Sequence, residues 1–265
     1  MNRWAWVLRG IPVVVVLALG SAFALVGFTN KELPTVPAAV RISTAASQAS
    51  TISGTWPGPP KKVAPTSFPV ADASGPSVSL FSAPDVPYGP KPALANPTHE
   101  GLPVVFVVLA DKGPWLQVRV SSRPNNLVLW VQRSQVTLRT VPNRVLIELG
   151  AHRVTVFHGD EVLLQETVAV GSSATPTPLG NFFVDGTVKV PYDTGPYGPY
   201  QVSVAGFSDV LQSFGGGVGQ IAMHGTNHPD LLGQNVSNGC VRMANDVITR
   251  MAELAPLGTP VDIVA

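Results

Sequence analysis

One short stretch of the chain, residues 224–240, contains two histidines and the only cysteine: HGTNHPDLLGQNVSNGC. An imidazole can take the proton of a thiol, and the resulting thiolate is the form that attacks a carbonyl carbon. His224 and His228 also have the H-x3-H spacing that places two zinc ligands on one face of a helix. The stretch therefore predicts a cysteine nucleophile with a histidine base, a metal site, or ordinary loop residues.

The zinc interpretation fits the surrounding residues poorly. Gly225 and Pro229 disfavour a regular helix, so the spacing of the two histidines loses its geometric meaning. A site built from His224, His228 and Cys240 would also have no second cysteine and no acidic base. We therefore expect no metal and interpret His228 as a loop residue.

The residues around Cys240 suit nucleophilic catalysis better. Ser237-Asn238-Gly239 is a turn-forming run that would leave the sulfur at a bend, among unpaired backbone N–H groups. Such groups can form an oxyanion hole, which contributes about 3 kcal/mol per donor. His224 follows the apolar residues IAM, so a strand end would fix its position, and the 15 intervening residues can fold back to bring imidazole to sulfur.

The charge balance of the whole chain argues against one class of partner. Of 265 residues, 17 are Lys or Arg and 16 are Asp or Glu. Nearly equal numbers give no electrostatic reason to expect a nucleic acid partner.

Residues 1–30 predict export. Residues 10–28 form an apolar run of 19 residues, close to the length of about 20 that a helix needs to span the hydrocarbon core. Arg3 and Arg9 precede this run and favour an N-terminus inside the cell. Ala22-Phe23-Ala24 also fits a signal-peptidase site, so a signal anchor and a cleaved signal peptide both stay open. Either one predicts an extracytoplasmic chain at the cell surface, anchored in the membrane or secreted.

Export makes the single cysteine informative. Exported proteins commonly use cysteines in pairs as disulfides, and Cys240 has no partner within the chain. An unpaired cysteine then predicts a reactive thiol or an intermolecular link. The alternative is a buried apolar cysteine.

The rest of the chain divides into three parts. Residues 31–77 are rich in Pro, Ala, Ser and Thr and predict an extended linker. Residues 78–140 contain short β-rich runs separated by turn signals, which predict a small antiparallel β-barrel accessory domain. Residues 141–265 contain further strand patterns and one helical pattern at 245–255, with Asn245 as its N-cap. The expected fold class is mainly β with one packed helix.

The run HGTNHPDLLGQNVSNGCVRM resembles the signature of the L,D-transpeptidases of the YkuD type: a His-Gly pair, a variable loop, and then Ser-x-Gly-Cys-apolar-Arg. TPTPLGNF at 175–182 resembles the family's Thr-Pro-x-Gly-x-Phe segment. The resemblance covers residues 143–265 and implies an L,D-transpeptidase-type β-sandwich. Residues 115–138 also resemble a bacterial small β-barrel of the Src-homology type that can precede this domain.

The resemblance implies a role for most residues of the signature. Cys240 would be the nucleophile and His224 its general base. The backbone amides of Gly239 and Cys240 would stabilise the oxyanion, and Ser237 would shape the loop. Two further residues are assigned to substrate binding: Gly225, and Arg242, which would orient the loop or hold a substrate carboxylate.

Asn238 departs from the family pattern, because many members carry histidine at this position. An asparagine in the loop can donate a hydrogen bond but cannot titrate. A mechanism with a second imidazole beside the thiol is therefore not open to this chain.

The resemblance implies an exported, membrane-tethered enzyme that acts on peptidoglycan stem peptides without metal or organic cofactor. Cys240 would attack the carbonyl of the L-centre of a diaminopimelate and release D-alanine. An amine of a neighbouring stem would then resolve the acyl-enzyme and form a 3-3 cross-link, and a carbapenem would acylate the same thiol. The alternatives are an L,D-carboxypeptidase, in which water resolves the acyl-enzyme, and a wall-binding protein with a degenerate catalytic domain.

Overall fold

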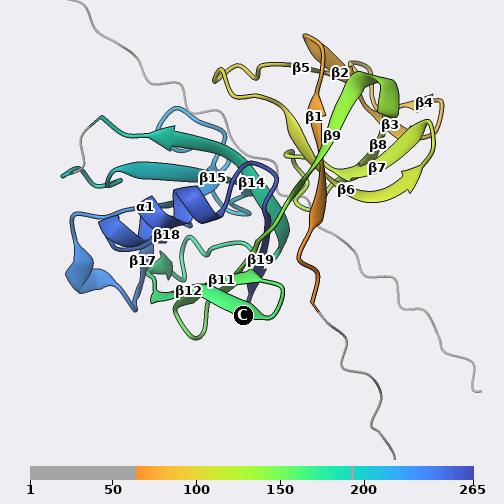
Figure 1. The fold of residues 1–265 in the computed structure, drawn as a ribbon. Helices are drawn as coiled ribbons and strands as arrows, with labels where there is room; N and C mark the ends of the chain where they lie inside the picture. The colour runs from red at the N-terminus through yellow and green to blue at the C-terminus, as the bar shows by residue number, and fades with distance from the viewer. Residues whose placement is uncertain (1–63, 192–193) are drawn as a thin grey trace, which may run out of the picture. The chain divides into compact units, whose positions relative to one another are not determined.

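The computed structural model describes residues 64–191 and 194–265 (Figure 1). In these residues the chain forms short and long strands, two 3-10 helices and a single α-helix, α1 (Asn245–Leu254). The prediction of a mainly β fold with one packed helix is therefore confirmed.

The predicted signal anchor or signal peptide, residues 1–30, lies outside the described residues, as does the linker up to residue 63. Within the part of the chain that is described, no helix is both long enough and apolar enough to cross a membrane.

The first sheet is antiparallel throughout, and its seven strands pair in the order β4-β3-β8-β7-β6-β1-β9. Two further short strands, β2 and β5, pair with each other. The bounds are β1 (Phe68–Ala73), β2 (Ser77–Ser79), β3 (Phe81–Ala83), β4 (Val86–Pro87), β5 (Ala93–Ala95), β6 (Val105–Lys112), β7 (Trp115–Arg119), β8 (Val128–Gln132) and β9 (Val136–Val141), with the 3-10 helix η1 at Arg133–Gln135. The antiparallel pairing was expected, and closure of this region into an accessory barrel stays a prediction.

The folded part begins earlier than the sequence pattern indicated. Strand β1 lies within the range 31–77 that we interpreted as a linker, and it pairs with both β6 and β9. Val70 and Ala71 are both fully buried, because the two faces of β1 contact two different hydrophobic clusters. A strand that is covered on both faces does not alternate, and Pro69 further masks it, since proline cannot donate to a ladder.

The second sheet has eight strands in the order β12-β11-β10-β19-β14-β15-β16-β18. Its pairs are antiparallel except β10 with β19 and β16 with β18, which are parallel. A separate parallel pair joins β13 and β17. The bounds are β10 (Arg144–Glu148), β11 (Arg153–His158), β12 (Glu161–Thr167), β13 (Val170–Gly171), β14 (Gly180–Lys189), β15 (Tyr200–Phe207), β16 (Gln220–His224), β17 (Asn235–Ser237), β18 (Val241–Arg242) and β19 (Pro260–Val264), with the 3-10 helix η2 at Pro229–Leu231.

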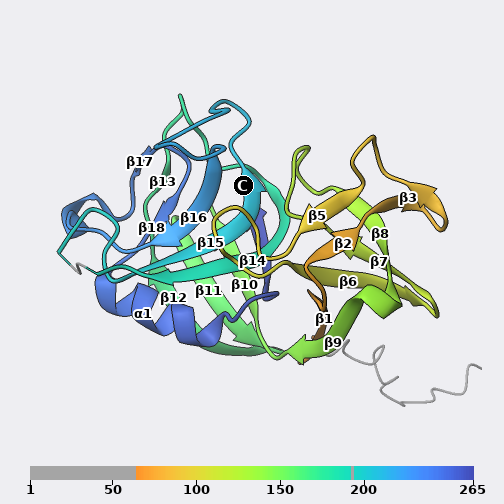
Figure 2. The ribbon, with the colours of Figure 1, turned by 90° about the horizontal axis from the view of Figure 1, so that it is seen from above.

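Helix α1 forms where the sequence pattern placed it, at 245–254 instead of 245–255. Val247, Ile248 and Met251 are buried, and the helix packs against β15 and β16 (Figure 2). Asn245 is the first helical residue and not the predicted N-cap, which is Ala244. The Asn245 side chain instead accepts a hydrogen bond from the backbone N–H of Thr226, at 2.9 Å.

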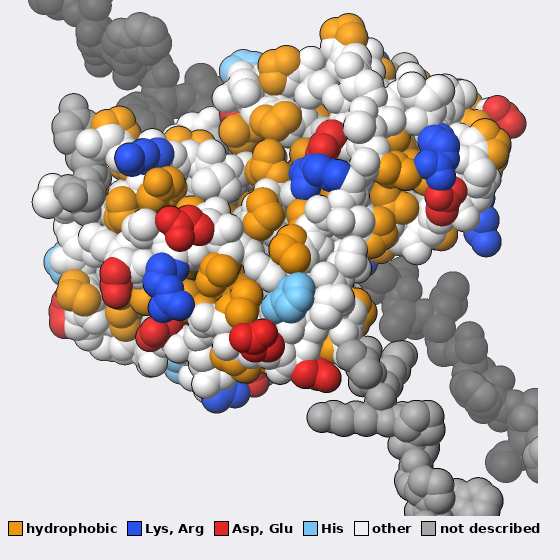
Figure 3. Space-filling model, viewed as in Figure 1, with side chains coloured by type: hydrophobic (Ala, Val, Ile, Leu, Met, Phe, Trp, Pro, Cys, Tyr) orange, Lys and Arg blue, Asp and Glu red, His pale blue; other side chains and the backbone are white. Residues whose placement is uncertain are grey.

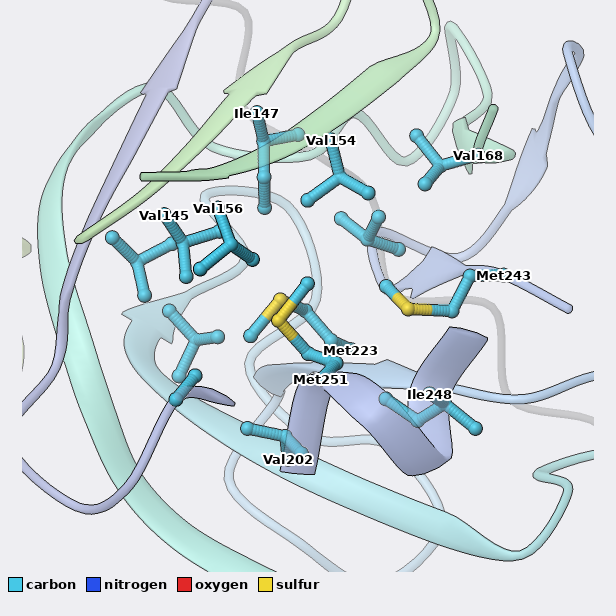
Figure 4. Packing of buried hydrophobic residues seen from close by; sticks show 14 of the residues in the cluster. Val145, Ile147, Val154, Val156, Val168, Val202, Met223, Met243, Ile248 and Met251 are labelled. Atoms are coloured by element: carbon cyan, nitrogen blue, oxygen red, sulfur yellow. The ribbon is translucent and has the colours of Figure 1, made fainter. Parts of the chain in front are cut away.

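One hydrophobic core serves the whole second sheet. Side chains of β10 and β11 point toward side chains of β15, β16 and α1, so the sheet folds over a shared interior (Figure 4). Met223, Met243 and Met251 are fully buried there, where flexible thioethers fill irregular gaps. Since Ile221 and Met223 point into this core, the alternate residues of β16 point to the opposite face of the sheet.

Charged side chains of both signs are interspersed with apolar ones over the face of the molecule drawn in Figure 3. Among the described residues of that face, Lys and Arg do not gather into a continuous basic surface of the kind that a phosphate backbone attracts.

A smaller hydrophobic cluster joins the two sheets. Phe183 of β14 and Ala205 of β15 contact residues of the first sheet, all buried: Val70, Val105, Val107 and Val141. The Arg139 guanidinium also donates to the Leu257 carbonyl oxygen, at 2.9 Å, and binds Asp72 through a second nitrogen at 2.6 Å. The two sheets therefore share buried surface and do not fold as unconnected modules.

Phe183→Ala should lower the free energy of unfolding by about 3–5 kcal/mol, because it removes a fully buried ring and leaves a cavity between the sheets. Urea unfolding of the full-length protein measures this loss. Val188→Ala, at an exposed position of the same strand, should change the same quantity by no more than about 0.5 kcal/mol. Similar losses for the two variants would contradict a shared core at Phe183.

Candidate active site

The parallel pair β16–β18 brings together the residues predicted to act. Met223 pairs with Val241 and His224 with Arg242, so Cys240 continues this register beside Ala222. Met223 and Val241 point into the core. Because successive side chains alternate, Cys240, Arg242 and His224 belong to the opposite face. The structure thus gathers three predicted residues from two segments on one surface of the sheet.

His224 is held as a neutral imidazole. Its side chain is buried at the end of β16, and its Nδ1 lies 2.6 Å from the Gly225 carbonyl oxygen. Since a carbonyl oxygen only accepts, Nδ1 carries the proton and Nε2 keeps its lone pair. Burial lowers the imidazole pKa to about 4, and the Arg242 charge adds to this effect against the Gly225 hydrogen bond. Near pH 7 the ring is therefore a neutral base.

The Cys240 thiol is protonated in the same environment. Burial raises the pKa of the thiol, while a backbone hydrogen bond from Ala222 and the positive charge of Arg242 oppose that rise. A lowered imidazole pKa and a raised thiol pKa favour a resting neutral pair over a thiolate–imidazolium pair.

Arg242 acts electrostatically on both partners. Its main chain is fixed by two hydrogen bonds with Ala169, each 2.8 Å long. Its Nε is buried and has no hydrogen-bond partner among the described residues. The predicted roles of Arg242, orienting the loop or binding a carboxylate, stay predictions, and an unpaired guanidinium nitrogen is compatible with either.

Ser237 shapes the turn that carries the cysteine. Its hydroxyl donates to the Cys240 carbonyl oxygen at 2.5 Å and accepts from the Gly239 N–H at 3.1 Å. Gly239 has φ of 115°, a conformation that side chains rarely adopt. Of the two amides assigned to the oxyanion, that of Gly239 is thus already paired. The Cys240 N–H has no partner within the described chain. Asn238 is exposed, and its predicted part in the loop is not tested.

Two threonines of the proline-rich loop hold this turn from the other side. Thr177 Oγ1 donates to the Gly239 carbonyl oxygen at 2.8 Å and accepts from the Gly171 N–H at 2.9 Å. Thr175 Oγ1 donates to the Ser237 carbonyl oxygen at 3.0 Å. Sequence reasoning noted these threonines only as part of a family motif. Their alternation with prolines was the one available signal that their hydroxyls bind a neighbouring backbone.

Gly225 has a packing role that sequence reasoning did not find. A Cβ at this position would lie 2.3 Å from Asn245 Oδ1 and 2.9 Å from the Gly198 Cα. Only glycines allow these two backbones to approach so closely. Next to Gly198, the Tyr197 ring lies edge-on to His224, with centroids 5.0 Å apart. Substrate contact by Gly225 stays a prediction.

The structure separates the two histidines by environment. The His228 side chain is 62% exposed, and its Nδ1 lies 3.9 Å from Asp230 Oδ1. His228 precedes η2 in the loop, whereas His224 is buried in the sheet. Within the described residues, no three His, Cys, Asp or Glu side chains are grouped so that they could hold a metal ion.

Thr177→Val should lower the free energy of unfolding by about 1–3 kcal/mol, because it leaves the buried Gly239 carbonyl and Gly171 N–H without their partner. Thermal and urea unfolding check this value. Thr175→Val removes a hydroxyl from a less buried position and should cost less. An equal or larger loss at Thr175 would contradict the importance assigned to Thr177.

The buried neutral His224 should make stability fall on acidification. Between its usual pKa of 6.5 and its folded value of about 4, the unfolded chain binds a proton that the folded chain does not. The resulting destabilisation is absent above about pH 6.5 and grows to roughly 3 kcal/mol below about pH 4. His224→Gln cannot take this proton and should lose that part of the pH dependence, measured by urea unfolding across this range.

The exposed His228 provides the control for this measurement. His228→Gln should keep the pH dependence of the unmodified protein, since its side chain is largely in solvent. An unchanged pH dependence in His224→Gln would show that His224 is not buried as a neutral ring.

Comparisons with known proteins now bear on this region. The family of the L,D-transpeptidase catalytic domain, YkuD, matches residues 142–263. The L,D-transpeptidase YkuD of Bacillus subtilis (strain 168) is 33% identical over 124 residues, which cover 47% of this chain and 67% of that protein. The L,D-transpeptidase YqjB of the same organism is 30% identical over 125 residues, covering 44% of this chain and 68% of that protein.

Solved structures of L,D-transpeptidases are more distant. One from Mycobacterium smegmatis is 20% identical, with a TM-score of 0.39 over 59% of this chain and 80% of that one. L,D-transpeptidase 3 of Mycobacterium tuberculosis, in complex with a faropenem-derived adduct, is 16% identical, with a TM-score of 0.37 over 60% of this chain and 97% of that one. The family match and the two Bacillus relatives, each at least 30% identical over two thirds of its length, establish that this chain belongs to the YkuD family of L,D-transpeptidases.

Proposed function

We propose that this protein forms 3-3 cross-links between peptidoglycan stem peptides through a cysteine acyl-enzyme. The observation that carries the proposal is the shared face of β16 and β18, where a thiol and a neutral imidazole with an available Nε2 lie in neighbouring strands. Family membership supplies the reaction class, and these residues supply a nucleophile and a base for it.

The first half of the reaction forms a thioester. Cys240 Sγ attacks the carbonyl carbon of the L-centre of diaminopimelate, and the thiol proton passes to His224 Nε2. The Cys240 N–H stabilises the oxyanion, and the Gly239 N–H joins it when Ser237 Oγ releases that amide. When the tetrahedral intermediate collapses, the C–N bond breaks. The departing D-alanine amine takes the proton back from the imidazole.

The second half returns the thiol. An amine of a neighbouring stem attacks the thioester carbonyl, and His224 accepts one proton from that amine. The C–S bond breaks, the new amide forms, and the proton returns to the Cys240 sulfur. Each step needs a base that is neutral near pH 7, which the lowered pKa of His224 supports.

The place of action follows from the substrate. Peptidoglycan lies outside the cytoplasmic membrane, so the proposed reaction requires an extracytoplasmic enzyme. The apolar run 10–28 would export the chain and, if it is not cleaved, would anchor it in the membrane.

Carbapenem acylation tests the thiol directly. A β-lactam carbonyl meets the same sulfur and amide donors as the peptide, so mass spectrometry of the full-length protein should detect one intact carbapenem per chain. Cys240→Ala should give no adduct and no release of D-alanine from tetrapeptide stems. His224→Ala should slow adduct formation by about 10²–10⁴-fold, as for loss of a general base. His228→Ala serves as the control and should react at nearly the rate of the unmodified protein.

The outcomes separate the competing functions. An unmodified thiol after long exposure to carbapenem would favour a degenerate catalytic domain in a wall-binding protein. Adduct formation with tripeptide products only, and no cross-linked dimers, would favour the L,D-carboxypeptidase alternative. Equal losses in His224→Ala and His228→Ala, together with inhibition by chelators, would favour a metal site.

A further inference from the structure

A cavity of about 300 Å³ lies between the first sheet's β5–β6 connection and the second sheet. Its walls are mainly apolar and include Leu102, Pro103 and Phe207, while Ser121, Asp185 and Gln220 contribute polar groups. This volume is at the lower end of the range of roughly 300–1,000 Å³ typical of small-ligand pockets. The cavity thus has the size and lining of a binding site, and the reaction proposed above does not use it.

Asp185 is the group in this cavity that the fold does not fully satisfy. It lies at a bulge of β14, between Val184 and Gly186. Its Oδ2 accepts from Ser121 Oγ at 2.5 Å and from Gln220 Nε2 at 2.7 Å. Its Oδ1 is buried and makes no hydrogen bond of good geometry in the described chain, although the Ser203 side chain also acts on the carboxyl and lowers its pKa. An unpaired buried acceptor costs about 1–3 kcal/mol, so the fold keeps this carboxyl at the expense of stability.

No basic side chain forms an ion pair with this carboxyl, although His99, next to Glu100, also lines the cavity. Among the described residues, none of the ion pairs includes Asp185. Arg123 lies at the same edge, over the Phe207 ring, but its guanidinium donates to the carbonyl oxygens of Ser208, Leu211 and Val218. Burial raises the pKa of Asp185 in spite of its hydrogen bonds. The group therefore lacks a cation that would let it ionise.

The remaining lining of the cavity favours a cationic ligand with an apolar stem. Leu102, Pro103 and Phe207 offer walls for methylene groups. Glu100 lines the same cavity, and hydrogen bonds to the backbone and to Thr98 lower the pKa of its carboxyl, so it stays ionised. Two acidic groups and apolar walls match an alkyl chain that ends in an ammonium group.

We propose that this cavity binds the aminoalkyl side chain of a diamino acid in a peptidoglycan stem, with the ammonium group at Asp185. The choice of a stem as the source of the amine rests on the proposed function. The ammonium would donate to the Asp185 carboxyl beside Ser121 and Gln220 and ionise it in a charge-assisted pair.

The amine held in the cavity is not the amine that reacts. Gln220 lines the cavity and lies two residues from Ala222, which is beside Cys240, so the two sites share one face of the sheet. Asp185 itself is three strand spacings from β18, roughly 14 Å at about 4.8 Å per spacing. An ammonium at Asp185 cannot reach a thioester on Cys240. The cavity would therefore hold a second, non-reacting stem and increase the affinity for wall material that carries many stems.

The binding step is tested by nuclear magnetic resonance of the full-length protein labelled with ¹³C in its aspartate carboxyl groups. The Asp185 resonance is identified by its loss in Asp185→Asn. Addition of n-butylammonium should move this resonance toward its ionised position, and n-butanol should not. If neither compound moves it, or if both move it equally, the cavity is no ammonium site and the proposal is overturned.

The functional consequence is tested by kinetics on two substrates. Asp185→Asn should raise the KM for insoluble wall fragments by about tenfold relative to the KM for a soluble tetrapeptide, the effect of about 1.4 kcal/mol of lost binding. Ser121→Ala removes a hydrogen bond from the same carboxyl but leaves the carboxyl in place, and it should have a smaller effect. Equal changes in both variants would assign Asp185 a purely structural role, and an unchanged KM ratio would overturn the subsite.

These readouts are independent of the proposed reaction. Carbapenem acylation of Cys240 reports on the thiol alone, and the resonance of Asp185 reports on the cavity alone. A protein that fails to form the adduct but binds n-butylammonium would contradict the transpeptidase and keep the ammonium site. A protein that forms the adduct but does not bind n-butylammonium would support the transpeptidase and overturn the ammonium site.

Discussion

The parallel register of β16 with β18 is the constraint on which the site depends. With Met223 opposite Val241, both of these side chains point into the core, and Cys240 shares the outer face with His224. A slip of one residue would turn Cys240 into the core and bring Val241 out, because side chains alternate along a strand. Burial of Met223 and Val241 therefore determines on which face of the sheet the Cys240 thiol lies. Thr177 and Ser237 then set the turn that leads into β18.

Burial has opposite effects on the pKa values of the two residues that we propose to react, and both effects favour their neutral forms. It lowers the pKa of His224 and raises the pKa of Cys240, and Arg242 moderates only the second effect. A permanently ionised thiol would be exposed to alkylation and oxidation at all times. In the proposed reaction, charge separates within this neutral pair when a carbonyl carbon takes the electron pair of the sulfur. The hydrogen bond from Nδ1 to the Gly225 carbonyl matters here, because it directs the available lone pair of Nε2 away from its own backbone.

Local signals in the sequence predicted the class of fold and the gathering of Cys240 with His224, whereas features that depend on long-range packing escaped prediction. The helix and the hairpin strands follow from periodicity and turn residues, which are local. Strand β1 was missed because both its faces are covered, which removes the alternation that identifies a strand. The roles of Gly225 and Asn245 depend on contacts with residues far along the chain, and no pattern within a short window encodes them. The pairing of the Gly239 amide could not be predicted, since it follows from the exact placement of the Ser237 hydroxyl.

The junction between the two sheets combines a well-packed part with an unsatisfied one. Phe183 and Ala205 are buried against valines of the first sheet, and this contact holds β14 and β15 in place. Two residues further along β14, at a bulge, Asp185 accepts hydrogen bonds from Ser121 of the β7–β8 connection and from Gln220 of β16. An asparagine there could accept from the same donors at a lower desolvation cost, because a neutral amide is easier to bury than a carboxyl that can ionise. Unlike the amide, a carboxyl at this position can form a charge-assisted pair with a cation. None of the ion pairs among the described residues includes Asp185, so a bound ligand would have to supply that cation.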